Sequence, residues 1–312
     1  MQVKILTKGP IISCVIVLLC ACSGRSNSTK STSDSMISSS VSVSDSVQPV
    51  EKNSSAVQNS VVSINPAQAN VAKSDIKAGQ QALLESYPDF ITKIENNTVY
   101  FKDGSTMVYD DGKTKNFQTL LDDGDIEDMF FVPYDSRITP PPYLYDPGRS
   151  RSEALYKKMY GSSSAAVART LVNVPWFGKS VKFTKVNGAA DALKAVAAEI
   201  AKYPELRKYI ASSGTFYWRT VRGAKRQSAH SYGIAFDIAV PHSDYWQWTN
   251  KTNDELKKIQ YKNRFPRKII EIFEKHGFIW GGSWYHYDTM HFEYRPEILR
   301  YSELVGQTPA HK

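Results

Sequence analysis

Two histidine-containing phrases from distant parts of the sequence constrain the fold most strongly. They are SAHSYGIAFD at residues 228–237 and WYHYDTMHFE at residues 284–293. Zinc sites that perform hydrolysis use three imidazole or carboxylate ligands and leave a fourth position for the attacking water. His230, Asp237 and His291 can supply this set. The fold must therefore bring the two phrases together.

Each proposed ligand has an alternative role. His230 could be a hydrogen-bonded histidine in a turn. Asp237 lies between Phe236 and Ile238 in a β-prone run, where a buried charge without a partner is costly, and this favours a metal. His286 competes with His291 as the third ligand, or it could orient the reaction intermediate.

The remaining chemistry needs a base and a cation. Asp288 lies three positions before His291, close enough to take a proton from the attacking water as a general base. A guanidinium group grips a carboxylate through two parallel hydrogen bonds. Arg219 is therefore the first candidate for a clamp on a substrate carboxylate, and Arg222 is the second.

The N-terminus predicts export. Lys4 and Lys8 precede a short apolar run at residues 11–19, which is typical of a cleaved signal peptide and too short for a permanent membrane span. Residues 19–22, Leu-Cys-Ala-Cys, resemble the bacterial lipobox, in which the last cysteine is acylated. We therefore expect lipidation at Cys22 and attachment to a membrane; an ordinary signal peptide cut nearby is the alternative.

Cysteine and charge exclude several classes of function. The chain has 3 cysteines, all in the signal or at its edge, so the exported part has no thiolate for catalysis or for metal binding. The formal net charge of +8 would weakly suggest nucleic acid, but export argues against that partner. We expect no nucleic acid and a monomer.

The composition divides the chain into five parts. A signal peptide at 1–21 is followed by a Ser/Thr-rich stretch at 22–78 with too few large apolar groups to fold, which we expect to be a disordered tether. Residues 79–165 are predicted to form a small accessory subdomain with a helix and a hairpin. Residues 166–305 are expected to form the catalytic domain, and 306–312 a tail.

Local patterns predict the elements of the fold. The Asp-Gly turn at 103–104 predicts a hairpin between residues 98–101 and 106–109. Helices are expected at 80–87, 153–159, 189–203 and 266–276, and strands at 214–219, 234–240 and from 278. Helices and strands mix without regular alternation, which predicts an α+β fold with a small, mostly antiparallel sheet flanked by helices and bearing a zinc cleft.

The combined motif is similar to a known family. S-x-H-x-x-G-x-A-x-D at 228–237, followed by D-x-x-H-F-E at 288–293, resembles the LAS metallopeptidases. The likeness is greatest to the branch of D-alanyl-D-alanine carboxypeptidases and L-alanyl-D-glutamate endopeptidases of the cell wall. Arg219 ahead of the first motif and W-G-G-x-W at 280–284 ahead of the second also resemble that branch. The likeness covers roughly residues 172–296.

The resemblance implies roles for single residues. It implies His230, Asp237 and His291 as zinc ligands, Asp288 as the base, and Ser228 with Arg219 as the carboxylate-binding pair. It leaves Glu293, which closes the second motif, without a role as ligand or base. A second-layer or structural role for Glu293 is therefore expected.

The function implied is zinc-dependent hydrolysis of peptide bonds in peptidoglycan stem peptides. A D-alanyl-D-alanine carboxypeptidase is the first choice, because an arginine clamp suits a free terminal carboxylate. An L-alanyl-D-glutamate endopeptidase is the alternative, and a non-catalytic wall-binding lipoprotein is the rival of another class. Serine after Cys22 resembles a sorting signal for the periplasmic face of the outer membrane.

Overall fold

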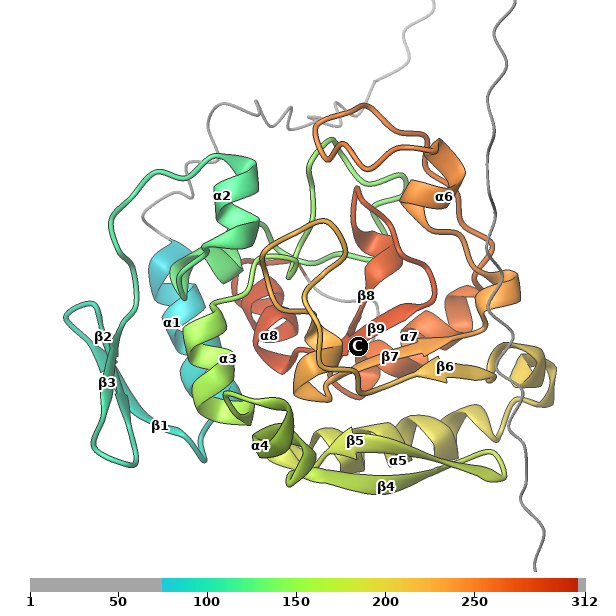
Figure 1. The fold of residues 1–312 in the computed structure, drawn as a ribbon, viewed down its shortest axis with the longest axis horizontal. Helices are drawn as coiled ribbons and strands as arrows, with labels where there is room; N and C mark the ends of the chain where they lie inside the picture. Colours follow the sequence, from blue (N-terminus) through green and yellow to red (C-terminus); the bar gives the residue numbers. More distant parts are fainter. Residues whose placement is uncertain (1–74, 308–312) are drawn as a thin grey trace, which may run out of the picture. The chain divides into compact units, whose positions relative to one another are not determined.

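The structure is a computed structural model that describes residues 75–307 (Figure 1). The predicted signal peptide, Cys22 and nearly all of the predicted tether lie outside the described residues. Helix α1 begins at Asp75, ahead of the predicted start near Gln80, so the last residues assigned to the tether are helical. No helix within 75–307 combines the length and the apolar character needed to cross a bilayer.

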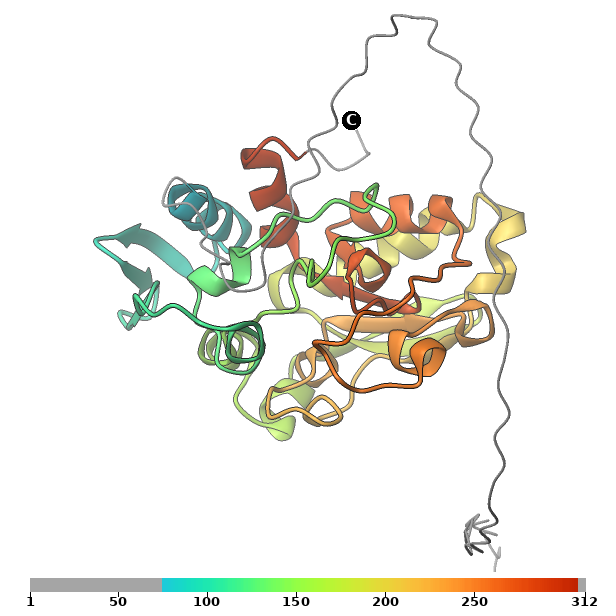
Figure 2. The ribbon, with the colours of Figure 1, turned by 90° about the horizontal axis from the view of Figure 1, so that it is seen from above.

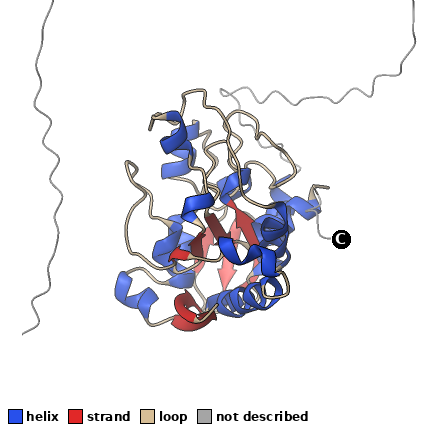
Figure 3. Cartoon of the chain, turned by 90° about the vertical axis from the view of Figure 1, so that its right-hand side faces the viewer, coloured by secondary structure: helices blue, strands red, loops and turns tan. Residues whose placement is uncertain are grey.

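A four-stranded antiparallel sheet carries the two phrases. Its strand order is β6-β7-β9-β8. The strands are β6 (Ser212–Gly214), β7 (Ala235–Ile238), β8 (Phe278–Trp280) and β9 (His291–Tyr294). Figure 3 shows strands at the centre of the molecule with helices around them. The antiparallel sheets flanked by helices confirm the α+β prediction.

One face of this sheet is apolar and covered by helices. Phe236 and Phe292 project from β7 and β9 into a buried cluster that also contains residues of α5 (Ala189–Ile200) and α7 (Arg267–Lys275). The rings of Phe273 and Phe292 stack with centroids 3.9 Å apart. Figure 2 shows α5 and α7 on the same side of the strands. Burial of these aromatic side chains holds the sheet against the helices.

The opposite face carries the polar residues of the two phrases. Successive side chains in a strand point to opposite faces. Because Phe236 points into the apolar cluster, Ala235 and Asp237 point the other way, and His291 does so in β9. Strand alternation therefore separates the apolar core from the candidate site.

The N-terminal segment shares a hydrophobic core with this sheet. Leu83, Val99 and Tyr156 belong to the same buried cluster as Ile279 and Ile298. The elements with residues in or against this cluster include α1 (Asp75–Ser86), β1 (Ile91–Glu95), β2 (Thr98–Phe101), β3 (Thr106–Val108), α3 (Glu153–Tyr160) and α8 (Pro296–Leu304). Helices α2 (Phe117–Asp122) and α4 (Ser164–Ala168) lie between β3 and α8 in the sequence. Apolar packing thus joins residues 82–160 to the site-bearing part of the chain.

Several local predictions are confirmed. The predicted hairpin forms as β2 and β3, paired in antiparallel register, and β1 adds a strand that the sequence analysis did not predict. The predicted helices at 153–159 and 266–276 correspond to α3 and α7. A second hairpin, β4 (Leu171–Trp176) with β5 (Lys179–Thr184), was also not predicted.

The predicted strand at 214–219 is wrong beyond its first residue. Strand β6 ends at Gly214, and Arg219 lies in an irregular loop. The buried hydroxyl of Ser231 accepts from the backbone N–H of Arg219 at 2.9 Å and lies 2.9 Å from its carbonyl oxygen. A side chain therefore satisfies the backbone groups that a neighbouring strand would otherwise bind.

Candidate metal and hydrolase site

His230 is placed by a short helix and a tight turn. It lies in the 3-10 helix η4 (Ala229–Tyr232), which ends at Gly233 with a φ of 67°. A side chain at Gly233 would also clash, because a Cβ there would lie 2.6 Å from a methyl carbon of Leu171. Glycine adopts this left-handed conformation without steric cost. The turn sends the chain directly into β7.

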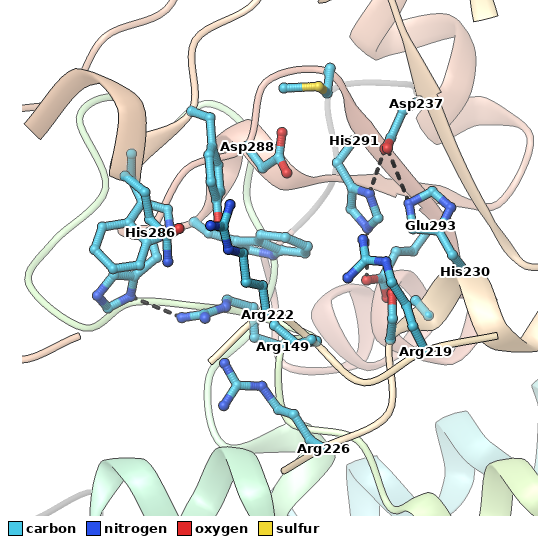
Figure 4. A pocket seen from close by; sticks show the side chains of 18 of the residues that line it. Arg149, Arg219, Arg222, Arg226, His230, Asp237, His286, Asp288, His291 and Glu293 are labelled. Carbon is cyan, nitrogen blue, oxygen red and sulfur yellow. Dashed lines mark hydrogen bonds and ion pairs between the residues drawn. The ribbon is translucent and has the colours of Figure 1, made fainter. Parts of the chain in front are cut away.

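Asp237 and His291 are neighbours across the sheet. They are register partners in the antiparallel pair β7–β9. His291 Nδ1 lies 2.8 Å from Asp237 Oδ1, and His230 Nε2 lies 3.2 Å from Asp237 Oδ2. The three side chains offer donor atoms that all lie within 4.8 Å of one another. The structure thus brings together the three side chains that the sequence analysis selected as ligands (Figure 4).

The outer nitrogen of each imidazole is fixed by a separate acceptor. His230 Nδ1 lies 3.0 Å from the backbone oxygen of Thr215, and His291 Nε2 lies 3.0 Å from Glu293 Oε1. When these nitrogens carry the protons, the other nitrogens turn their lone pairs towards Asp237. Partners of this kind orient histidine ligands in metal sites. The arrangement therefore suits a cation shared by His230, Asp237 and His291.

The electrostatics of the cluster also favour a positive charge. Burial by itself raises the pKa of Asp237, but His230 and His291 hold that pKa well below its usual range. Burial lowers the pKa of His291, yet hydrogen bonds to Asp237 and Glu293 outweigh it and raise the pKa to about 10. A site that stabilises both a carboxylate and a proton attracts cations.

Asp288 lies beside the cluster in the same cavity. Its Oδ1 is buried without a hydrogen-bond partner among the described residues. Burial, with a smaller contribution from Asp237, raises the pKa of Asp288 to about 7. An unpartnered carboxylate oxygen beside the three candidate ligands is suited to hold a water molecule and accept its proton.

These residues fit a zinc ion. Two neutral imidazoles and one carboxylate form the kind of three-ligand set found in catalytic zinc sites, with space for water left open. The orphaned oxygen of Asp288 supplies an acceptor next to that space. His230, Asp237 and His291 would hold the ion.

The cavity has a volume of about 310 Å³ and a strongly basic wall. Ser228, Arg219 and Arg222 all line it, and the two arginine side chains are exposed. Figure 4 shows Arg219 near the three candidate ligands and Arg222 nearer Asp288. The structure thus places all three substrate-binding candidates on one cavity, although Arg219 reaches it from a loop and not from the predicted strand.

His286 lies outside the group of three candidate ligands. Its Nδ1 is 2.6 Å from Asp146 Oδ2 and 2.9 Å from an Arg149 nitrogen, and its Nε2 is 2.9 Å from the backbone oxygen of Glu255. Both ring nitrogens are therefore occupied by protein groups. The geometry favours His291 over His286 as the third ligand.

Some supporting residues were not selected from the sequence. Thr215 orients His230 through its backbone oxygen, and any residue could supply that group, so no sequence signal marks it. Ser231 holds the Arg219 loop, but a serine inside a turn has many local uses. These contacts depend on segments that meet only in the folded chain.

Residues 222–294 match the family model of D-alanyl-D-alanine carboxypeptidases. The matching segment contains all three proposed ligands and Asp288, whereas Arg219 and the N-terminal elements lie outside it. No curated protein matches the chain. The segment that carries the site is therefore similar to a peptidase family.

Proposed function

We propose that this protein is a zinc-dependent peptidase that hydrolyses peptide bonds in peptidoglycan stem peptides, with removal of terminal D-alanine as its main reaction. The observation that carries the proposal is the convergence of His230, Asp237 and His291 beside Asp288, whose Oδ1 has no hydrogen-bond partner among the described residues. The match of residues 222–294 to D-alanyl-D-alanine carboxypeptidases supports the substrate class.

The chain supplies a base beside the ligands. A zinc ion in the site would polarise the scissile carbonyl group and the attacking water. Asp288 takes the proton from the water and delivers it to the leaving amine. Burial raises the pKa of Asp288 above the usual range of a carboxyl group, and a base works best when its pKa is near the working pH.

Two arginines are free to bind a substrate carboxylate. Arg149, Arg151 and Arg226 also line the cavity, but each forms an ion pair with a buried or half-buried carboxylate. Arg219 and Arg222 form no ion pair within residues 75–307, and the Arg219 side chain donates a hydrogen bond to the backbone oxygen of Thr220 at 3.2 Å. A free terminal carboxylate would neutralise this side of the cavity.

Replacing Arg219 with alanine tests the clamp. We expect kcat/KM for a D-alanyl-D-alanine peptide to fall roughly 10- to 150-fold, because a charged hydrogen bond contributes about 1.5–3 kcal/mol. Steady-state kinetics on a peptide and on its C-terminal amide measure the effect. The amide should be a poor substrate for the wild-type protein, and Arg219→Ala should lose this discrimination.

Arg222→Ala is the matched comparison, since Arg222 is also an exposed arginine on the cavity wall. A large loss with Arg222→Ala and none with Arg219→Ala would transfer the clamp to Arg222. Normal kinetics in both variants would contradict an arginine clamp.

An L-alanyl-D-glutamate endopeptidase is the second candidate, because the α-carboxylate of D-glutamate could occupy the same clamp. Purified pentapeptide and tetrapeptide muropeptides, incubated with the protein and zinc, separate the two activities by product mass. Loss of one alanine from the pentapeptide supports the carboxypeptidase. Release of the peptide after L-alanine supports the endopeptidase, and binding without cleavage supports a wall-binding protein.

We also propose export and lipid attachment, on the basis of the N-terminal sequence. Lysines ahead of an apolar run and the lipobox-like residues 19–22 support acylation of Cys22 and a position at the periplasmic face of the outer membrane. In a bacterial host, the wild-type chain should partition into detergent with the membrane fraction, and Cys22→Ser should not. Equal partitioning of the two chains would contradict the anchor.

A further inference from the structure

Glu293 connects the candidate metal site, through His291, to two buried arginines. Its Oε1 lies 3.0 Å from His291 Nε2 and 3.1 Å from an Arg151 nitrogen, and its Oε2 lies 3.1 Å from an Arg295 nitrogen. Glu293 is 1% exposed, so these groups provide its contacts in place of water. The orientation of Glu293 therefore depends on both arginines.

Arg151 comes from outside the segment that matches the peptidase family. It lies just ahead of α3, in the N-terminal part of the chain, whereas the matched segment is 222–294. Its side chain is 9% exposed, and its second terminal nitrogen lies 3.4 Å from the backbone oxygen of Gln227. Its ion-pair partner, Glu293, contacts the candidate metal ligand His291.

The second arginine is held independently of Arg151. Arg295 donates to Glu297 Oε1 at 2.5 Å and to the backbone oxygen of Gly148 at 2.6 Å. Glu297 in turn accepts from the hydroxyl groups of Tyr87 and Tyr156. This network anchors one oxygen of Glu293, so Arg151 is left to determine the direction of the other oxygen, the one that meets His291.

The contact between Glu293 and His291 affects how His291 binds a metal. A carboxylate that accepts from the outer nitrogen of a histidine fixes its tautomer and increases its basicity as a ligand. Without Arg151, Glu293 would lose a charge partner and a constraint on its Oε1.

We propose that Arg151 is a positioning residue for the metal site. Arg151 holds Glu293 in place, and Glu293 keeps His291 Nδ1 directed at Asp237. Through Arg151, the N-terminal segment contributes to metal affinity. This inference rests on the metal site of the proposed function.

Metal affinity of the full exported chain, measured by competition with a chromophoric chelator, tests the inference without any hydrolysis assay. We expect Arg151→Met to weaken zinc binding by up to about 10- to 100-fold, the loss usual when an outer partner of a ligand, here Glu293, is disturbed. The ligand-field spectrum of the Co²⁺-loaded protein should also change, because the direction of His291 changes.

Arg300→Met is the matched control. Arg300 also joins a C-terminal helix to the N-terminal segment, through an ion pair with Glu85 at 2.6 Å, but it belongs to neither the cavity nor the network of Glu293. It should leave zinc affinity and the Co²⁺ spectrum unchanged. Equal losses in Arg151→Met and Arg300→Met would overturn the inference, because they would indicate general loosening of the fold.

A double-mutant cycle tests the route through Glu293. Once Glu293→Gln has removed the carboxylate, adding Arg151→Met should weaken zinc binding by less than threefold. A full additional loss would overturn the inference. If Arg151→Met does not fold, Arg151→Lys takes its place, because lysine keeps the charge but lacks the planar guanidinium; wild-type affinity in that variant would also overturn it.

The outcomes for the inference and for the proposed function are separable. Zinc binding by the wild-type chain with unchanged affinity in Arg151→Met would overturn only the role of Arg151. Zinc binding that depends on Arg151, without cleavage of any muropeptide, would overturn the peptidase and leave the inference standing. A wild-type chain that binds no zinc would overturn both.

Discussion

Asp288→Asn is expected to lower turnover of a stem peptide by about 10²- to 10⁴-fold, the usual contribution of a general acid–base residue. Asparagine has nearly the same shape but cannot accept the proton of the attacking water. Zinc content should stay at the wild-type level, since Asp288 is not among the three clustered ligands. Product formation by mass and zinc by atomic absorption are the two measurements.

Asp254→Asn is the matched control for this prediction. Asp254 is an exposed carboxylate whose side chain accepts from the backbone N–H of Leu256, and it does not line the cavity. Its conversion to asparagine should leave turnover within about twofold of the wild type. Full activity in Asp288→Asn would remove Asp288 as the base and require another proton acceptor in the cavity.

Removal of the metal should have an equally large effect, on stability as well as on activity. If zinc binds only the folded chain, a zinc concentration 1,000 times the Kd stabilises the folded state by about 4 kcal/mol. For a domain of this size, this corresponds to a shift in Tm of about 8–16 °C, taking ~2–4 °C for each kcal/mol. A chelator should therefore abolish turnover and lower the Tm, and added zinc should restore both.

His230→Ala should make the Tm insensitive to zinc and to chelator. His242→Ala is the matched control, because His242 packs against Tyr209 and is not one of the three candidate ligands. The zinc-dependent shift in its Tm should equal that of the wild type, whatever the absolute Tm. If chelator changes neither the Tm nor the activity of the wild-type chain, the metal-dependent mechanism fails.

The clustering of His230, Asp237 and His291 was predictable because each motif combines chemistry with a local backbone pattern. The alternation in β7 puts Phe236 and Ile238 on one face and Asp237 on the other, and this follows from the two-residue period of a strand. Gly233 marks the turn because few other residues tolerate its φ of 67°. Such signals depend on nearest neighbours in the sequence.

The loop that carries Arg219 was predicted less well. The run of Phe, Tyr and Trp at 216–218 favours a strand by propensity, yet the backbone there bonds to the hydroxyl of Ser231. Propensity describes an average environment, and one buried hydroxyl with several partners overrides it. The position of the candidate clamp was therefore decided by a tertiary contact.

The sequence alone determined the faces of β7 and the α+β class, and it predicted the candidate ligands and the candidate base, because side-chain chemistry and strand period are local properties. Only the tertiary structure decided that Asp237 and His291 are register partners, that both nitrogens of His286 are occupied, and that Arg151 reaches Glu293. Each of these contacts joins segments separated by tens of residues. Their pairing depends on which apolar faces pack together, and that information is distributed over the whole core.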